Sequence, residues 1–191
     1  MKHLHNTSLW LFFILSVPAL PSCNNSNPGP SKELINQVNL KRGAVISCGT
    51  ADQQFGSVDF EITCDEKSKD DFNLEIKLLH SFEYDESEKV FAKIIDETPE
   101  CAMAYWGVAM SNFHALWTPP TEEELLKGSK AIEIANTINK KSKRETAYIN
   151  AIAEFYKDWD KTNHLTRCIN YEKAMEKVHN TYPDDKEAAI F

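Results

Sequence analysis

Apolar residues recur at helical spacing from Asp65 to the end of the chain. A period of 3.6 residues places side chains three and four positions apart on one face, so this spacing predicts a series of amphipathic α-helices. Prolines, or clusters of Asn, Asp, Ser and Thr, mark the breaks between them. The predicted helices run from Lys69 to His80, from Tyr84 to Pro99, from Pro99 to Trp117, onward from Thr121, from Ser142 to about Trp159, from His164 to Thr181, and onward from Lys186.

Two of these helices begin with the pattern of a capping box. Thr121 is followed by Glu124, and Ser142 is followed by Glu145. In a capping box, the hydroxyl of the first residue and the carboxylate three residues later each accept a hydrogen bond from the other's backbone N–H. Both helix starts are therefore fixed by local chemistry.

The chain before these helices has no sustained helical period. Glycines interrupt it, and Val58 to Ile62 alternates apolar and polar residues, which is typical of a short strand or of an extended segment lying against a domain. We expect residues 44–64 to form an irregular N-terminal arm. Residues 65–191 are expected to form an all-α unit of antiparallel helix hairpins.

The N-terminus is typical of an export signal. Lys2 precedes an apolar run from Leu9 to Leu20, which is too short to cross roughly 30 Å of hydrocarbon as a helix. The next residues, Leu20-Pro21-Ser22-Cys23, resemble the bacterial lipobox, although proline departs from that pattern. The resemblance implies a lipoprotein signal peptide over 1–22 and a lipid on Cys23. An ordinary secretory signal cut near Ala19 or Ser22 is the alternative.

Acylation of Cys23 would hold the protein stably on a membrane, because more than one acyl chain is attached in lipoproteins of this class. Residues 23–43 begin with a polar stretch rich in Pro and Gly, which predicts a flexible tether. No acidic residue follows Cys23 directly. By resemblance to lipoprotein sorting rules, this favours the outer membrane of the bacterial envelope, with the domain facing the periplasm.

Composition narrows the classes of partner. The chain of 191 residues is 42% hydrophobic and 26% charged, which fits one globular domain with appendages. Its formal net charge of −8 argues against nucleic-acid binding, because phosphate recognition needs clustered Lys and Arg.

The helical region resembles the tetratricopeptide repeat, in which each helix pair has 34 residues. The matching residues are Leu74, Leu78, Tyr84, Ser87, Phe91, Ile94 and Pro99. The resemblance implies a right-handed solenoid over 65–191, with a concave groove formed by the first helices of successive pairs. Glu75 stands where the repeat usually has a small residue, and Pro99 and Pro183 are 84 residues apart, where two regular repeats would separate them by 68.

Three stretches are similar to a group of exported bacterial tetratricopeptide proteins with no assigned biochemical role: Leu79 to Glu88, Cys101 to Gly107, and Tyr182 to Ala189. Members of that group are usually longer, and Phe191 lies within the apolar start of a helix, so we expect the sequence to be a fragment. The resemblance implies binding of a protein or peptide partner. The leading hypothesis is thus a membrane-anchored adaptor or scaffold without catalysis and without a cofactor.

A metal-binding protein or metal-dependent enzyme is a second hypothesis. His80, His114 and Cys101 could meet if neighbouring helices pack as hairpins, giving nitrogen and sulfur ligands of the kind that zinc takes. No HExxH or other close ligand pair occurs, however. The alternative interpretation places both histidines at helix ends and treats Cys101 as a small buried apolar residue.

The remaining cysteines allow a disulfide in an exported protein. Cys48 and Cys64 form the natural pair, because their bond would staple the weakly packed arm. Free thiols are the alternative.

A third hypothesis is a glycan- or peptide-binding lipoprotein of an outer-membrane uptake system. Trp117, Tyr105 and Trp106 could supply the aromatic surface for such a ligand. Trp117 is the best candidate, because its proline-containing loop interrupts the repeat. Aromatic residues in such a pattern more often form the core.

Overall fold

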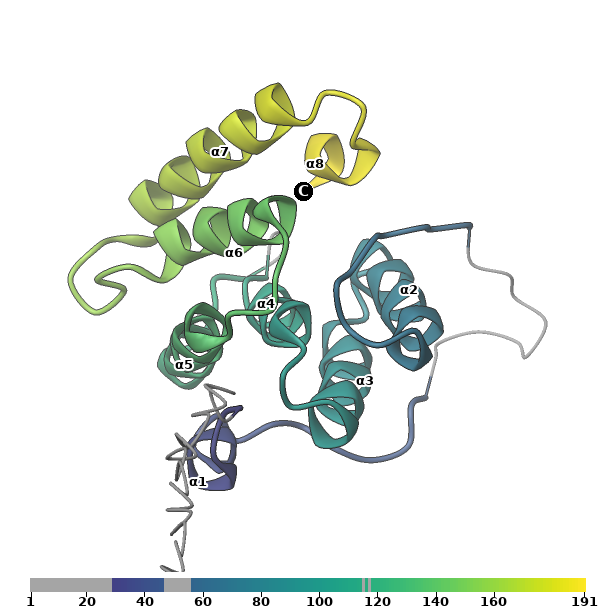
Figure 1. The fold of residues 1–191 in the computed structure, drawn as a ribbon. Helices are drawn as coiled ribbons and strands as arrows, with labels where there is room; N and C mark the ends of the chain where they lie inside the picture. The colour runs from purple at the N-terminus through teal and green to yellow at the C-terminus, as the bar shows by residue number, and fades with distance from the viewer. Residues whose placement is uncertain (1–28, 47–55, 115, 117) are drawn as a thin grey trace, which may run out of the picture.

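The computed structural model describes residues 29–46, 56–114, 116 and 118–191, which form eight α-helices (Figure 1). The expected signal peptide, Cys23, Cys48 and Trp117 lie outside the described residues. The helices are α1 (Lys32–Asn36), α2 (Lys67–His80), α3 (Tyr84–Glu97), α4 (Ala102–Ser111), α5 (Glu122–Thr137), α6 (Lys143–Tyr156), α7 (His164–Thr181) and α8 (Lys186–Ile190).

The helices pack as consecutive pairs. α2 packs on α3, α4 on α5, and α6 on α7, and each pair is joined to the next through α3 with α4 and α5 with α6. The first helices of the pairs also touch one another, α2 with α4 and α4 with α6, whereas α8 packs on α7. The described chain is therefore all-α and built from helix hairpins, as the periodicity predicted (Figure 1).

Close packing between neighbouring helices depends on two glycines. A Cβ on Gly107 of α4 would lie 2.0 Å from the ring of Phe91 of α3. A Cβ on Gly128 of α5 would lie 2.2 Å from the ring of Tyr156 of α6. The Tyr156 hydroxyl donates to the carbonyl oxygen of Ala109 at 2.6 Å, so its ring packs on Gly128 while its buried hydroxyl keeps a hydrogen-bond partner.

Both predicted capping boxes are confirmed. The Thr121 hydroxyl accepts from the backbone N–H of Glu124, whose carboxylate accepts from the backbone N–H of Thr121. Ser142 and Glu145 make the same reciprocal pair at the start of α6. These helices begin where their local sequence predicts, because a capping box needs no tertiary partner.

The second half of the expected tether is packed against the helices. Ser31 caps α1, and Ile35, Val38 and Leu40 join the hydrophobic core. The expectation of a flexible tether over 23–43 is therefore wrong for its latter part. The apolar residues of 35–40 bury surface that a freely moving tether would expose.

The arm is extended where it enters the helical unit. Phe60 is fully buried, Val58 and Ile62 are half-buried, and the alternate residues Asp59 and Glu61 are exposed. This alternation confirms an extended segment lying against the domain. Among the described residues none is assigned to a strand, because the segment bonds to side chains of helices and not to a neighbouring strand.

No helix in the described part of the chain combines the length and apolar character needed to cross a membrane.

Candidate functional site

An aromatic pocket on the first helices holds the arm. The ring of Phe60 lies 5.4 Å from Phe72 of α2, 5.8 Å from Trp106 of α4 and 5.3 Å from Tyr148 of α6, measured between ring centroids. The guanidinium carbon of Arg144 lies 4.2 Å from the centroid of the same ring. One side chain of the arm is thus enclosed by residues from three helix pairs, and its position is favoured by aromatic and cation–π contacts.

Side chains of α2 and α6 bind the backbone of the arm at Phe60 and on its C-terminal side. The N–H of Phe60 donates to Asn73 Oδ1 at 2.9 Å. The N–H and hydroxyl of Thr63 donate to the two carboxylate oxygens of Glu145, each at 2.7 Å. Arg144 donates to the carbonyl oxygen of Glu61 at 3.1 Å. The arm is therefore bound largely through backbone groups that every peptide has.

Arg144 also joins the arm to the turn before α8. Its guanidinium makes two hydrogen bonds to the carboxylate of Asp185, at 2.6 and 3.0 Å, and the Tyr148 hydroxyl donates to the same carboxylate at 2.8 Å. Burial opposes ionisation of Asp185, but these hydrogen bonds outweigh it and lower its pKa. The pocket around Phe60 is consequently held by a satisfied polar network.

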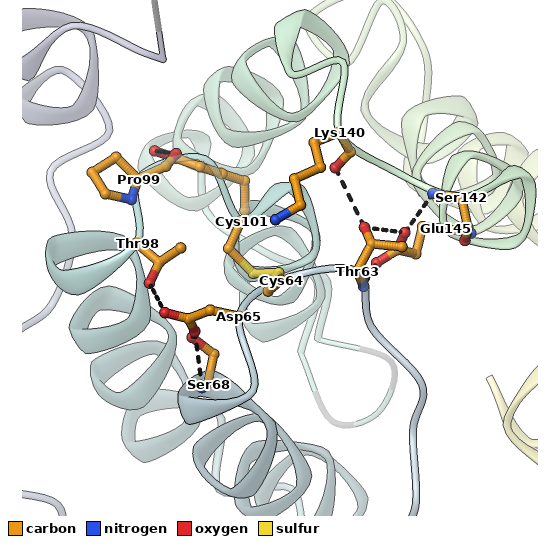
Figure 2. The surroundings of a disulfide bond; sticks show 11 residues. Thr63, Cys64, Asp65, Ser68, Thr98, Pro99, Cys101, Lys140, Ser142 and Glu145 are labelled. Carbon is orange, nitrogen blue, oxygen red and sulfur yellow. Dashed lines mark hydrogen bonds between the residues drawn. A yellow bond between two sulfur atoms is a disulfide. The ribbon is translucent and has the colours of Figure 1, made fainter.

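A disulfide closes the end of the arm, between Cys64 and Cys101 (Figure 2). The expected Cys48–Cys64 pairing is wrong, because Cys64 is bonded to the residue that precedes α4. This bond links the arm to the second helix pair, and it also removes the Cys101 thiolate from the proposed metal site. The separation of 37 residues gave no local signal for this pairing.

An apolar cavity of about 330 Å³ lies at the carboxyl ends of α2 and α4. Its lining comprises Leu79, His80, Phe82, Tyr84, Met110, Phe113, Ile190 and Phe191. The sequence predicted a role for two of them, His80 as a possible metal ligand and Tyr84 as a repeat position. Phe113 and Phe191 carry no motif, and α8 brings Ile190 and Phe191 back to α2 from more than 100 residues away, which is a property of the tertiary fold alone.

Polar contacts on one side of this cavity come from His80. Its Nε2 lies 2.7 Å from a carboxylate oxygen of Glu187, and its ring stacks on Phe191 with centroids 4.9 Å apart. Phe191 in turn meets the edge of Trp106 at 5.4 Å. A ligand in the cavity would thus lie against aromatic surface with one polar pair beside it.

Two residues beside the cavity have left-handed backbone conformations. Phe82 has φ 60° and lines the cavity, and His114 has φ 49° and stacks on Tyr84 with ring centroids 5.1 Å apart. A bulky residue with positive φ costs free energy and persists only where surrounding contacts require it. The packing at this end of α2 and α4 therefore outweighs local backbone preference.

A wider depression of about 620 Å³ adjoins the cavity and shares Phe113, Ile190 and Phe191 with it. Its floor comes from α7 and α8, where Leu165 is 68% exposed and Ile190 is 61% exposed. Glu172 and Glu176 give this depression an acidic edge. Together the two hollows form a mainly apolar surface bordered by carboxylates.

The proposed metal ligands are not brought together. His80 contacts Glu187, His114 lies 3.3 Å from Glu124, and Cys101 is in the disulfide. The described residues contain no group of three or more His, Cys, Asp and Glu side chains that could hold a metal ion.

Two of the three proposed ligand-contact aromatics belong to the core. Tyr105 is 0% exposed and Trp106 is 1% exposed, so neither meets solvent. The hydroxyl of Tyr105 donates to the carbonyl oxygen of Pro99 at 3.0 Å, which satisfies its one polar group. The prediction that these two residues contact a ligand is therefore wrong. All sides of α4 are covered by other parts of the fold, and the sequence of the helix does not reveal this.

No known protein family, no curated protein and no solved structure matches this chain.

Proposed function

We propose that this protein is a membrane-anchored helical-repeat adaptor of the tetratricopeptide type, which binds a protein or peptide partner and performs no catalysis. The stacking of successive helix hairpins supports this proposal, because the first helices contact one another as they do in a solenoid. The anchor is the lipid expected on Cys23.

The observation that carries the binding role is the apolar cavity between Phe82, Phe113 and Phe191. Aromatic rings supply contact area at little cost in side-chain entropy, and they are common in the centres of binding surfaces. The acidic edge formed by Glu172 and Glu176 favours basic residues beside the inserted group. The expected partner segment therefore carries an aromatic or aliphatic residue flanked by Lys or Arg.

Peptide selection tests this proposal. Peptides from a random displayed library are selected on the purified protein, and their affinity is measured by fluorescence anisotropy. We expect the selected peptides to share an apolar residue with basic neighbours. Ile190→Asp should weaken binding by about tenfold or more, equivalent to about 1.4 kcal/mol, because it places a charge in the apolar surface.

Leu126→Asp is the matched control, because Leu126 is also an exposed aliphatic residue, at 45%, but lies on α5 and does not line the cavity. It should change affinity less than about twofold. Failure to select any peptide, or equal affinity of the Ile190→Asp variant and the unaltered protein, would contradict the proposal.

The anchor is tested separately by labelling expressing cells with a radioactive fatty acid. The full chain should incorporate label and fractionate with membranes, and Cys23→Ser should abolish both. Unlabelled secreted protein would instead support ordinary cleavage near Ala19 or Ser22.

A further inference from the structure

The chain has three arginines, and they differ in whether a carboxylate accompanies them. Arg42 is exposed and makes two hydrogen bonds to Asp96. Arg144 is half-buried and makes two hydrogen bonds to Asp185. Arg167 is the most deeply buried of the three, at 4% exposed, yet it has no carboxylate partner among the described residues. The arginine that most needs a counter-ion is therefore the one without it.

The guanidinium of Arg167 lies between α7 and α6. Its carbon is 4.8 Å from the ring centroid of Phe155, and its Nε and Nη1 atoms are buried without a hydrogen-bond partner in the described chain. The cation–π contact attracts the charge but accepts neither of these N–H groups in a hydrogen bond. Because arginine keeps its proton in proteins, the side chain carries a full charge where an unpaired charge is costly.

The described groups around Arg167 supply no negative charge. Burial lowers the pKa of Arg167, and only the Cys168 thiol and the Tyr156 hydroxyl oppose that effect. Burial raises the pKa of both of these groups, so both are uncharged at neutral pH. Burial also opposes the charge of Arg144, but there the hydrogen bonds to Asp185 outweigh it and raise the pKa. A carboxylate is thus what distinguishes the two buried environments.

Arg167 stands in the first turn of α7, where negative charge is favoured. The start of a helix presents backbone N–H groups and the positive end of the dipole. His164 belongs to the same turn, and its Nδ1 is also buried without a partner in the described chain, while its Nε2 lies 3.5 Å from the Cys168 sulfur. Burial and the charge of Arg167 lower the pKa of His164. If the thiol donates to Nε2, the neutral ring carries its proton on Nδ1 and adds a third donor.

We propose that the start of α7 is a binding site for a small carboxylate, held by the guanidinium of Arg167 and the first turn of the helix. A planar carboxylate accepts two parallel hydrogen bonds from one guanidinium, as Asp96 and Asp185 do with the other arginines. Its single negative charge matches the single charge of Arg167. This site is separate from the apolar cavity, so it does not depend on the adaptor proposal.

The burial of Arg167 limits the size of the ligand. A carboxylate with a long chain attached could not reach the guanidinium of a residue that is 4% exposed without displacing α6 or α7. Leu165 and Cys168 of neighbouring positions line the wider depression, which brings solvent to the adjacent side of α7. The expected ligand is therefore the anion of a small free carboxylic acid, and not the end of a peptide chain.

The Nε–H signals of arginine in a proton–nitrogen NMR spectrum test the site directly, because the full chain gives only three of them. Formate replaces chloride at constant ionic strength. We expect the Arg167 signal to shift saturably. The signals of Arg42 and Arg144 are internal controls and should stay nearly unchanged, because both side chains already bind aspartates. An Arg167 signal that does not respond, or three signals that move alike, would overturn the proposal.

A second arm of the same titration distinguishes a free acid from a chain end. N-acetyl-glycyl-glycine carries its carboxylate at the end of a peptide, and it should leave the Arg167 signal in place because the guanidinium is enclosed. If this compound shifts the signal as much as formate does, the ligand is a peptide end and the proposal of a small free carboxylate is wrong.

Thermal melting of substituted chains is the independent measurement. Saturating formate should raise the melting temperature of the unaltered chain by at least about 4 °C relative to chloride. Arg167→Met should remove this rise, and in chloride it should melt no lower than the unaltered chain, because an apolar side chain replaces an unpaired buried charge. Arg42→Met is the matched control and should keep the rise. A rise that persists in Arg167→Met would place the anion elsewhere and contradict the proposal. If Arg167→Met does not fold, the spectra of the unaltered chain still decide.

Discussion

The two extended segments of the N-terminal region are held to the helices by different forces. Residues 41–46 lie against α3, where their contacts are mostly solvent-accessible ion pairs and hydrogen bonds. Residues 57–64 lie against α2, α4 and α6, where they contribute a fully buried ring and a disulfide. One chain thus uses surface charge on one side of the helix pairs and apolar burial on the other.

Exposed ion pairs and buried rings differ in strength and in selectivity. The guanidinium of Arg42 makes two hydrogen bonds to Asp96, at 2.8 and 2.9 Å, with both side chains nearly half exposed. Such a pair is screened by salt and contributes little to stability. A buried Phe depends on shape and on its neighbours in space, so we expect the inner segment to control folding more strongly than the outer one.

The largest expected effect is that of Phe60→Ala, which should lower the free energy of unfolding by about 4 kcal/mol because it removes buried apolar surface and leaves a cavity. Val45→Ala on the outer segment is the control, because Val45 is 42% exposed and should cost less than about 0.5 kcal/mol. Urea unfolding followed by circular dichroism measures both values. Equal losses would show that the two segments are held alike.

The outer segment has one buried attachment, and its loss should have the next largest effect. The backbone N–H of Lys41 donates to Glu88 at 2.7 Å, and Glu88 is paired at 2.8 Å with Lys127, the two side chains being 1% and 5% exposed. Lys127→Ala should destabilise the protein by about 3 kcal/mol, since it leaves a buried carboxylate without its counter-ion.

That value stands at the lower end of the range for buried pairs, because Asn112 Nδ2 still donates to Glu88 at 3.1 Å. Lys130→Ala is the control on the same helix, because Lys130 makes only an exposed hydrogen bond to the Gln37 carbonyl oxygen. A similar loss of stability from both substitutions would show that the buried pair has no special importance.

The inner segment lies against α2, which contains a buried carboxyl group without a counter-ion. This group, on Glu75, differs in that respect from Glu88, which is paired with Lys127. Glu75 is 0% exposed, and neither of its carboxylate oxygens has a hydrogen-bond partner. Burial raises its pKa well above the ordinary value, with Asp71 adding to the rise and Lys93 opposing it. Glu75→Met should therefore stabilise the protein, by about 2 kcal/mol at pH 7.5.

The sign of the pH dependence follows from that raised pKa. Because the pKa of Glu75 is higher in the folded protein than in the unfolded chain, whose carboxyl group loses its proton above about pH 4, Glu75 weakens folding as the pH rises above that value. Below about pH 4 both states carry the proton and this penalty vanishes. The gain from Glu75→Met in urea unfolding should hence shrink at pH 4, whereas a pH-independent gain would show that Glu75 is ionised when folded.

The smallest expected effect is that of Arg42→Ala, which should cost about 0.5 kcal/mol at low ionic strength and less in 1 M NaCl. The hydrogen bonds from Arg42 lower the pKa of Asp96 against the opposing effect of burial. The measurement is urea unfolding at both salt concentrations. A loss of several kcal/mol that persists in 1 M NaCl would mean that the outer segment is held as firmly as the inner one.

The sequence by itself determined where several helices begin and where the arm is extended, because these features show in the pattern of neighbouring residues. Periodicity and capping residues placed the starts of α5 and α6 correctly at Thr121 and Ser142, and the alternation around Phe60 indicated an extended segment. Hydrogen bonds three or four residues apart decide the two helix starts, so these need no distant partner. The alternation around Phe60 indicates only which residues face a partner.

Contacts between distant segments were decided only by the tertiary structure. The sequence offered Cys48 as the natural partner of Cys64, yet the fold brings Cys101 to it. It offered Tyr105 and Trp106 as ligand contacts, yet three helix pairs and the arm bury them. Disulfide pairing and the exposure of an aromatic ring depend on which surfaces meet in space. The helical period identifies the apolar face of each helix, but it does not identify the segment that covers this face.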